Sequence, residues 1–194
     1  MDFSLRQFDI IDSALHLTAD FGLSGLTMKR LSSSLGITEP ALYRHFPNKS
    51  AIVKGMIHYF ESIAVSIFSE ISSKGLRGVS ALEYFIKDRF NLVVSRPALA
   101  KVLFSDEQFL DDPEYSSLLL AMMHDHRVHI CRMLEEAIAD SAIRSDIRVD
   151  ILFRLVLGPV RLLIKQWGLS QQAFDLIESG NELWASMLKL LSNS

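Results

Sequence analysis

The sequence predicts an all-α protein, because apolar residues recur with helical spacing along the chain and no segment shows the two-residue alternation of a strand. The chain has 194 residues, 49% of them hydrophobic, which is enough to bury a sizeable core. We expect about nine helices, divided between a three-helix N-terminal domain in residues 1–50 and a larger helical domain in residues 51–194.

The first helix is predicted by Ile10, Ala14, Leu17 and Phe21, which recur every three or four residues and form one apolar face. Gly22 ends this helix. We expect the four apolar side chains to face the core of the N-terminal domain.

Two short helices follow, and each has a clear start and stop. Thr27 caps the first, and Gly36 suits the left-handed residue that ends it. Thr38 caps the second, Pro40 lies in its first turn, and Pro47 stops it. Two short helices joined by a tight glycine turn, after a longer supporting helix, form a helix-turn-helix, here at about residues 27–46.

The second short helix has an inward and an outward side. Leu42 and Phe46 are spaced to anchor it in the core, which leaves small and polar residues on the side that can enter a DNA groove. Small residues at its start allow close approach to base edges, and the donors that follow suit phosphate oxygens. The residues expected to contact DNA are Thr27, Lys29, Thr38, Glu39, Pro40, Ala41, Tyr43, Arg44, His45 and Lys49.

The charge is unevenly distributed. Residues 1–60 hold six Lys or Arg against five acidic residues, a net charge of +1, whereas the rest of the chain holds 14 against 18, a net charge of −4. A basic head on an acidic body fits a polyanion at the N-terminal end, although +1 is far below the charge of many DNA-binding domains.

The last two predicted helices are apolar around more of their circumference than one core can cover. A second copy of the chain would bury the surplus, so we expect a homodimer. Gly158, next to Pro159, suggests a close crossing or a kink in the first of these helices. The residues expected at the dimer interface are Leu155, Leu162, Trp167, Trp184 and Leu188.

The body of the chain is rich in Phe and Met, which suit either an adaptable apolar pocket or a plain core. If a pocket forms, its polar anchors are cationic or neutral, so the ligand is expected to be small and mainly apolar, with an anionic group as one alternative. The candidate ligand-binding residues are Phe85, Arg89, Phe104, Met122, His126, His129 and Arg161.

Enzyme chemistry has little support in the sequence. His126 and His129 could share a metal if a third ligand joined them, but structural or pocket-lining histidines are the favoured interpretation, and we expect no metal site. Nucleophile motifs, phosphate-binding glycine loops and dinucleotide fingerprints are absent. We expect no cofactor.

Cys131 is the only cysteine, so no internal disulfide can form. The sequence shows no signal peptide and no apolar run long enough to cross a bilayer, so the chain is expected to be cytoplasmic, without a membrane partner.

The stretch "GLSGLTMKRLSSSLGITEPALYRHFPNKSAIV", residues 22–53, resembles the DNA-binding segment of TetR-type transcriptional regulators. Ser33 and Ser34 depart from it where an alanine is usual, and the N-terminal arm offers only Arg6. The matching positions are Gly22, Thr27, Leu31, Gly36, Leu42, Tyr43, Phe46 and Lys49.

The resemblance implies an all-α regulator that dimerises through its last two helices, binds an operator through residues 1–50 and binds a small effector through residues 51–194. The expected function is a repressor that the effector releases from a palindromic operator. The alternative is a TetR-like DNA-binding protein that acts through a protein partner in nucleoid organisation or cell division. An all-helical enzyme is a third hypothesis, and it would need polar groups that converge in the body.

Overall fold

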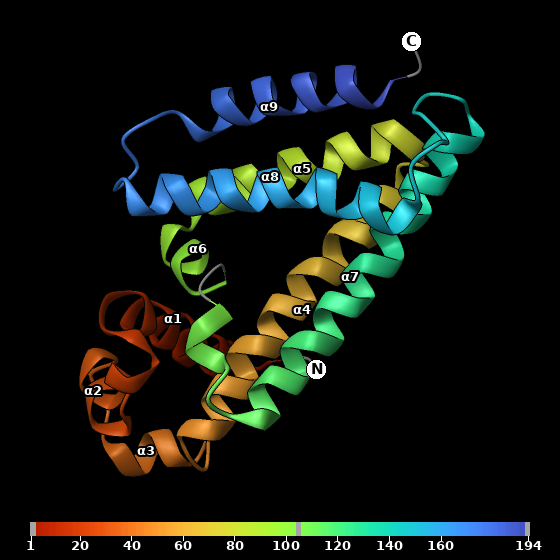
Figure 1. The fold of residues 1–194 in the computed structure, drawn as a ribbon. Helices are drawn as coiled ribbons and strands as arrows, with labels where there is room; N and C mark the ends of the chain where they lie inside the picture. The colour runs from red at the N-terminus through yellow and green to blue at the C-terminus, as the bar shows by residue number, and fades with distance from the viewer. Residues whose placement is uncertain (1–2, 104–105, 193–194) are drawn as a thin grey trace. The chain divides into compact units, whose positions relative to one another are not determined.

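The computed structural model describes residues 3–103 and 106–192, and within them it contains nine α-helices, one 3-10 helix and no strand (Figure 1). The predicted all-α fold class is confirmed. In chain order the elements are α1 Leu5–Gly25, α2 Met28–Ser34, α3 Glu39–Tyr43, α4 Lys49–Ser73, α5 Gly78–Ser95, α6 Pro97–Leu103, η1 Asp106–Phe109, α7 Pro113–Ala139, α8 Val149–Leu169 and α9 Leu176–Leu191.

The chain forms two compact units. One comprises Met1–Ile63 and Lys101–Met122, and the other comprises Ala64–Ala100 and Met123–Ser194. The long helices α4 and α7 each contribute to both units. The division of functions at residue 50 stays a prediction.

In the first unit, α1 begins with a capping box, in which Ser4 Oγ accepts from the Gln7 amide and Gln7 Oε1 accepts from the Ser4 amide. Its buried face includes Ile10 and Ala14, as expected. Phe21 is 54% exposed, so its predicted place in the core is wrong. Phe21 is the last residue before the helix breaks at Gly22, whose φ is 69° and ψ 170°, and its ring lies against the Arg30 guanidinium at the surface.

Helix α4 is the central apolar helix of the chain. Asn48 Oδ1 accepts from the Ala51 amide at 2.8 Å and caps its start, as predicted. Gly55 lets α4 approach its neighbours, because a Cβ there would stand 3.3 Å from both Ile11 Cδ1 and Phe46 Cε1. By length and composition α4 could cross a membrane, but 56% of its apolar window is buried in the protein, as in the core helix of a folded domain.

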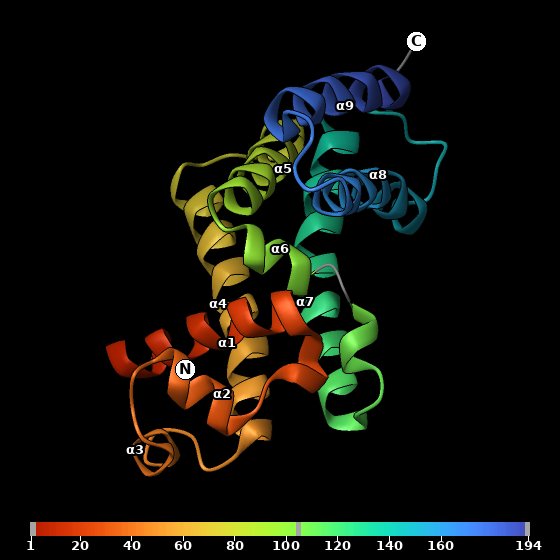
Figure 2. The same ribbon diagram turned by 90° about the vertical axis from the view of Figure 1, so that its left-hand side faces the viewer.

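In the second unit, α5, α8 and α9 lie side by side (Figures 1 and 2). The close crossing is made by Gly180 of α9, which packs against Phe90 of α5. We expected the close crossing at Gly158, but this residue is exposed, and a Cβ there would meet nothing. Because a side chain before proline disfavours helical geometry, a glycine at this position helps α8 to continue through Pro159.

Candidate nucleic-acid interface

The segment from Thr27 to Phe46 forms the predicted helix-turn-helix (Figure 2). Thr27 Oγ1 accepts from the Arg30 amide at 3.1 Å, and Thr38 Oγ1 accepts from the Ala41 amide at 3.4 Å, so both threonines are N-caps. Gly36 has a φ of +63°, the left-handed conformation that glycine adopts without steric cost, and it turns the chain between α2 and α3.

The inward side of this motif is buried, which fixes how α2 and α3 lie. Leu31 of α2 and Leu42 of α3 are fully buried, and Phe46 follows α3 into the core. On the outward side Thr38, Pro40 and Arg44 are exposed. The remaining predicted contacts on this segment, Glu39, Ala41 and His45, are half-buried.

Tyr43 ends α3 with 46% of its surface exposed, an uncommon position for a large aromatic residue. Its ring and hydroxyl are therefore accessible, and the predicted contact with a phosphate stays a prediction. Thr27 and the exposed Lys29 line a surface hollow of ≈ 510 Å³ at the start of α2. The other residues of this hollow are Ser24, Gly25, Arg30 and Ser33.

Arg30 was not among the predicted contacts, although it lies beside Lys29 in this hollow. Its guanidinium lies 4.4 Å from the centroid of the Phe21 ring and donates to the Gly25 carbonyl at 2.8 Å. These contacts hold the cation at the exposed side of α2. The pairing with Phe21 depends on the break at Gly22, so the spacing of the sequence gave no signal for it.

Lys49 is engaged within the protein. Its Nζ donates to the Leu23 carbonyl at 2.6 Å, and the side chain is half-buried, which lowers the pKa of the ammonium by desolvation. The cation therefore holds the first turn of α4 to the end of α1. Its predicted contact with a phosphate stays a prediction and would have to use the remaining two protons of Nζ.

Three of the predicted ligand-binding residues surround a ring that the sequence did not single out, Phe68 of α4. The centroid of the Phe68 ring lies 4.2 Å from that of His129 and 5.4 Å from that of Phe85, both stacked, and 5.7 Å from that of His126, which is edge-on. The Arg89 guanidinium lies 5.2 Å from the Phe85 centroid. Burial and the charge of Arg132 lower the pKa of His129, which favours its neutral form.

The other predicted ligand residues lie apart from this aromatic cluster of Phe68, Phe85, His126 and His129. Arg161 is half-buried on α8. Met122 is buried in the unit that holds the helix-turn-helix, and Phe104 falls outside the described residues. In the part of the chain that the structure describes, no group of three or more His, Cys, Asp or Glu could hold a metal.

The predicted interface residues divide into two groups. Leu155 and Leu162 are 48% and 58% exposed on α8, and Leu188 is half-buried on α9. Trp167 and Trp184 are each 5% exposed, and Trp167 Nε1 donates to the Phe174 carbonyl at 3.1 Å. The two tryptophans therefore belong to the core of the protomer, because their large rings fill the space between the helices.

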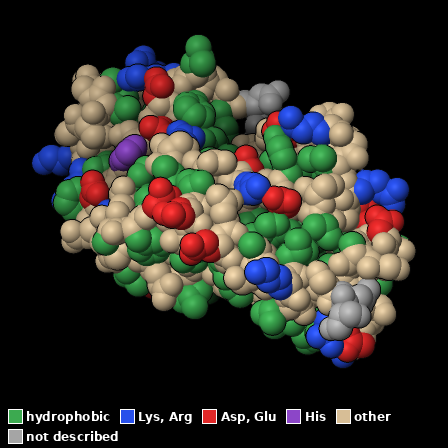
Figure 3. Space-filling model, turned by 90° about the horizontal axis from the view of Figure 1, so that it is seen from above, with side chains coloured by type: hydrophobic (Ala, Val, Ile, Leu, Met, Phe, Trp, Pro, Cys, Tyr) green, Lys and Arg blue, Asp and Glu red, His purple; other side chains and the backbone are tan. Residues whose placement is uncertain are grey.

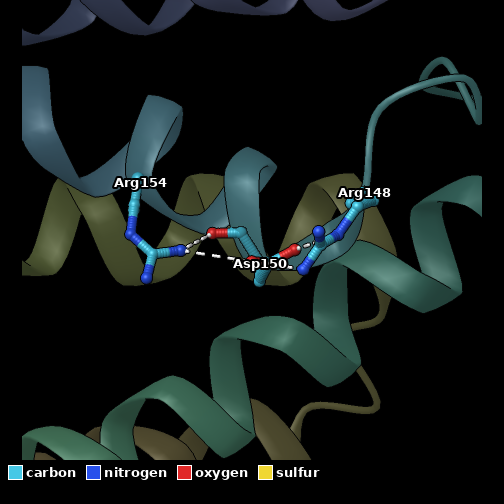
Figure 4. A network of polar contacts seen from close by, with 3 residues as sticks. All are labelled: Arg148, Asp150 and Arg154. Carbon is cyan, nitrogen blue, oxygen red and sulfur yellow. Dashed lines mark hydrogen bonds and ion pairs between the residues drawn. The ribbon is translucent and has the colours of Figure 1, made fainter.

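Helices α8 and α9 expose both apolar and charged side chains. Figure 3 looks onto the side that carries α9, where hydrophobic side chains gather in patches between charged ones. A hollow of ≈ 410 Å³ between the two helices is lined by Leu162 and Leu183, among other residues. At the start of α8, Asp150 accepts from both Arg148 and Arg154 (Figure 4), which leaves a hydrophilic border there.

Residues 10–56, which include the whole helix-turn-helix, match the family model described as "Bacterial regulatory proteins, tetR family". The N-terminal segment is a TetR-type DNA-binding domain. The chain is 24% identical over 151 residues to the HTH-type transcriptional repressor KstR2 of Rhodococcus jostii, an alignment that covers 78% of this chain and 74% of the relative. It is 21% identical over 183 residues to the nucleoid occlusion factor SlmA of Vibrio vulnificus, an alignment that covers 94% of this chain and 93% of the relative.

The fold of the chain is also that of solved structures. The transcriptional regulator FadR from Bacillus subtilis, in complex with stearoyl-CoA, superposes with a TM-score of 0.82 at 18% identity, covering 95% of this chain and 98% of that one. Together with the helix-turn-helix, the family model and the relative KstR2 support a DNA-binding transcriptional regulator.

Proposed function

We propose that the protein is a homodimeric cytoplasmic repressor that binds a palindromic operator and leaves it when a small, mainly apolar effector binds. The helix-turn-helix carries this proposal. Its buried side fixes α3 on the protein, and its exposed side offers a threonine, a proline and an arginine at the place where a groove would lie.

A dimer is needed because one five-residue recognition helix reads few base pairs. Two copies related by a two-fold axis would place their α3 helices in successive major grooves, about 34 Å apart. The exposed leucines of α8 and the hollow between α8 and α9 support these two helices as the interface.

The dimer is tested by sedimentation velocity at micromolar concentration. Leu162→Glu should shift the protein to monomers and abolish specific DNA binding, because a carboxylate in an apolar interface loses its hydration. Leu120→Glu is the matched control, since Leu120 of α7 is 66% exposed and lies outside the proposed interface. A wild-type protein that sediments as a monomer would refute the proposed interface.

The proposed effector is an amphipathic molecule with an acyl chain and an anionic end. The aromatic cluster around Phe68 supplies apolar side chains, of which Phe68 and Phe85 are buried, and Arg89, whose side chain is 12% exposed, lies beside it with its charge shared by Asp88. The complex of the related FadR with stearoyl-CoA supports the same class of ligand. By linkage, an effector that prefers a dimer with wrongly spaced α3 helices weakens operator binding by its differential affinity.

The effector is tested by thermal shift and by release of DNA. Stearic acid or stearoyl-CoA should raise the melting temperature, whereas coenzyme A alone and divalent metals should not. The same ligand should lower the affinity for a duplex selected by the protein from a random library, and the duplex should lower the affinity for the ligand by the same factor. Stabilisation by divalent metals alone would instead point to His126 and His129.

A second candidate function is DNA binding that acts through a protein partner, without a small ligand. The relationship to SlmA supports it, because the alignment extends over nearly the whole of both chains. The two candidates differ in one outcome. If no acyl ligand shifts the melting temperature and the selected duplex stays bound in their presence, the partner-dependent function is favoured.

A further inference from the structure

The backbone of Leu23, just before the helix-turn-helix, is held at its amide and at its carbonyl by side chains from distant parts of the chain. The Leu23 amide donates to Gln108 Oε1 at 3.1 Å, and the Leu23 carbonyl accepts from Lys49 Nζ at 2.6 Å. Lys49 is the first residue of α4, and Gln108 lies in η1, 85 positions beyond Leu23. All three residues belong to the same compact unit.

The break in α1 explains why the backbone groups of Leu23 need side-chain partners. Gly22, with its φ of 69° and ψ of 170°, turns the following peptide out of helical geometry. A partly buried backbone amide that leaves the helical ladder needs another acceptor, and Gln108 supplies one. Because Gly22 has a positive φ, a side chain there would be strained, so the break is fixed by the sequence.

The position of this peptide matters for α2. Leu23 is four residues before Thr27, the N-cap of α2, and the chain between them makes a single turn in which the Leu26 amide donates to the Leu23 carbonyl at 3.3 Å. With so short a connection, the direction of α2 follows the orientation of the Leu23 peptide.

Gln108 is itself firmly placed. The next residue, Phe109, is 1% exposed and anchors η1 in the core of the unit. A few residues later, Glu114 at the start of α7 forms an ion pair with Lys54 of α4. The segment from Lys101 to Met122 is therefore packed with the helix-turn-helix, although it follows it by more than 50 residues in the chain.

We propose that Gln108 is a positioning residue for DNA binding: through the Leu23 amide it fixes the direction in which α2, and with it α3, is presented. A displacement of η1 would be transmitted to the helix-turn-helix by the loss of this hydrogen bond. The inference rests on the proposed DNA-binding function and adds to it a residue outside the helix-turn-helix.

The first test measures hydrogen exchange of the amides in residues 22–27 in the full-length protein without DNA. Gln108→Ala should speed exchange of the Leu23 amide by about ten-fold, the effect of losing one hydrogen bond. Gln108→Glu keeps an Oε acceptor and should retain the protection. Glu107→Ala, at the exposed neighbouring position on η1, is the matched control and should leave the exchange unchanged.

The second test measures affinity for the duplex that the wild-type protein selects from a random library. Gln108→Ala should weaken binding about ten-fold, Gln108→Glu should bind more tightly than Gln108→Ala, and Glu107→Ala should match the wild type. The melting temperature of Gln108→Ala should fall by no more than a few degrees, so that a loss of affinity is not a loss of folded protein.

The outcomes separate this proposal from the proposed function. Unchanged exchange in Gln108→Ala would show that the hydrogen bond does not hold the peptide and would overturn the proposal. Faster exchange with unchanged DNA affinity would equally overturn it, because Gln108 would then be structural only. If the wild-type protein selects no duplex, the proposed function fails, while the exchange experiment still decides whether Gln108 holds the Leu23 peptide.

Discussion

Gly180 of α9 lies against Phe90 of α5 so closely that a Cβ built on the glycine would meet Phe90 Cε2 at 2.4 Å. Phe90 is 2% exposed and packed between the helices of the second unit, so its ring cannot move away without opening the core. The glycine therefore sets the distance between α9 and α5.

Gly180→Ala should lower the free energy of unfolding by about 1–3 kcal/mol, the usual cost of overpacking a core. For a chain of this size the melting temperature should fall by about 2–4 °C per kcal/mol. Gly168→Ala on α8 is the matched control, because a Cβ there meets nothing, and it should leave the melting temperature unchanged or raise it. Equal melting temperatures for the two variants would contradict the close packing.

Thr18 of α1 is buried, and its Oγ1 has no hydrogen-bond partner among the described residues. Thr18→Val keeps the shape and removes the unsatisfied hydroxyl, so the free energy of unfolding should stay the same or rise by up to about 1 kcal/mol. Thr18→Ser keeps the hydroxyl and removes a buried methyl, so it should lower that free energy by about 1 kcal/mol. Urea denaturation measures both, and a valine variant less stable than the serine variant would reveal a partner for the hydroxyl.

Tyr43→Phe should weaken binding to the selected duplex and to random DNA by similar factors, because a phosphate contact carries no sequence information. The loss expected for one hydroxyl is about 1 kcal/mol. Tyr84→Phe is the control: Tyr84 Oη donates to Glu70 in the second unit, which does not contain the helix-turn-helix, and its loss should leave DNA binding unchanged. Fluorescence anisotropy measures both affinities, and a change confined to base preference would show that Tyr43 reads sequence.

Stability should fall as the pH drops below about 6.5, because the pKa of His129 is lowered in the folded protein from its ordinary value of 6.5. Below that pH the unfolded chain takes up a proton more readily than the folded one, and unfolding is favoured. His129→Phe keeps a ring to stack on Phe68 and removes the titration, so its melting temperature should fall less between pH 7.5 and 5.5. His124→Phe, at an exposed position on the same helix, should show the wild-type decrease.

The helices and the helix-turn-helix could be predicted from the sequence because their signals are local. Thr27, Thr38 and Asn48 cap helices through amides three residues away, and Gly36 adopts its left-handed conformation within a single turn. The burial of Leu31 and Leu42 follows from the same helical spacing. Interactions within about four residues need no knowledge of the rest of the chain.

Only the tertiary structure shows which apolar side chains are buried within the chain and which charged groups are already hydrogen-bonded inside it. Spacing marked Phe21 for the core and Trp167 for an interface, but Phe21 lies at the surface against Arg30, and packing in the second unit buries Trp167. Lys49 matched the family pattern, but its ammonium is engaged by the Leu23 carbonyl.

Periodicity states which face of a helix is apolar and says nothing of what that face meets. In the sequence Phe68 is one apolar residue among many. In the structure the packing of α4, α5 and α7 places Phe85, His126 and His129 around its ring. Gln108 carries no pattern at all, and its role follows from a hydrogen bond to a residue 85 positions away. Such a contact is set by the packing of the whole unit, in which the buried Phe109 places η1 beside the end of α1.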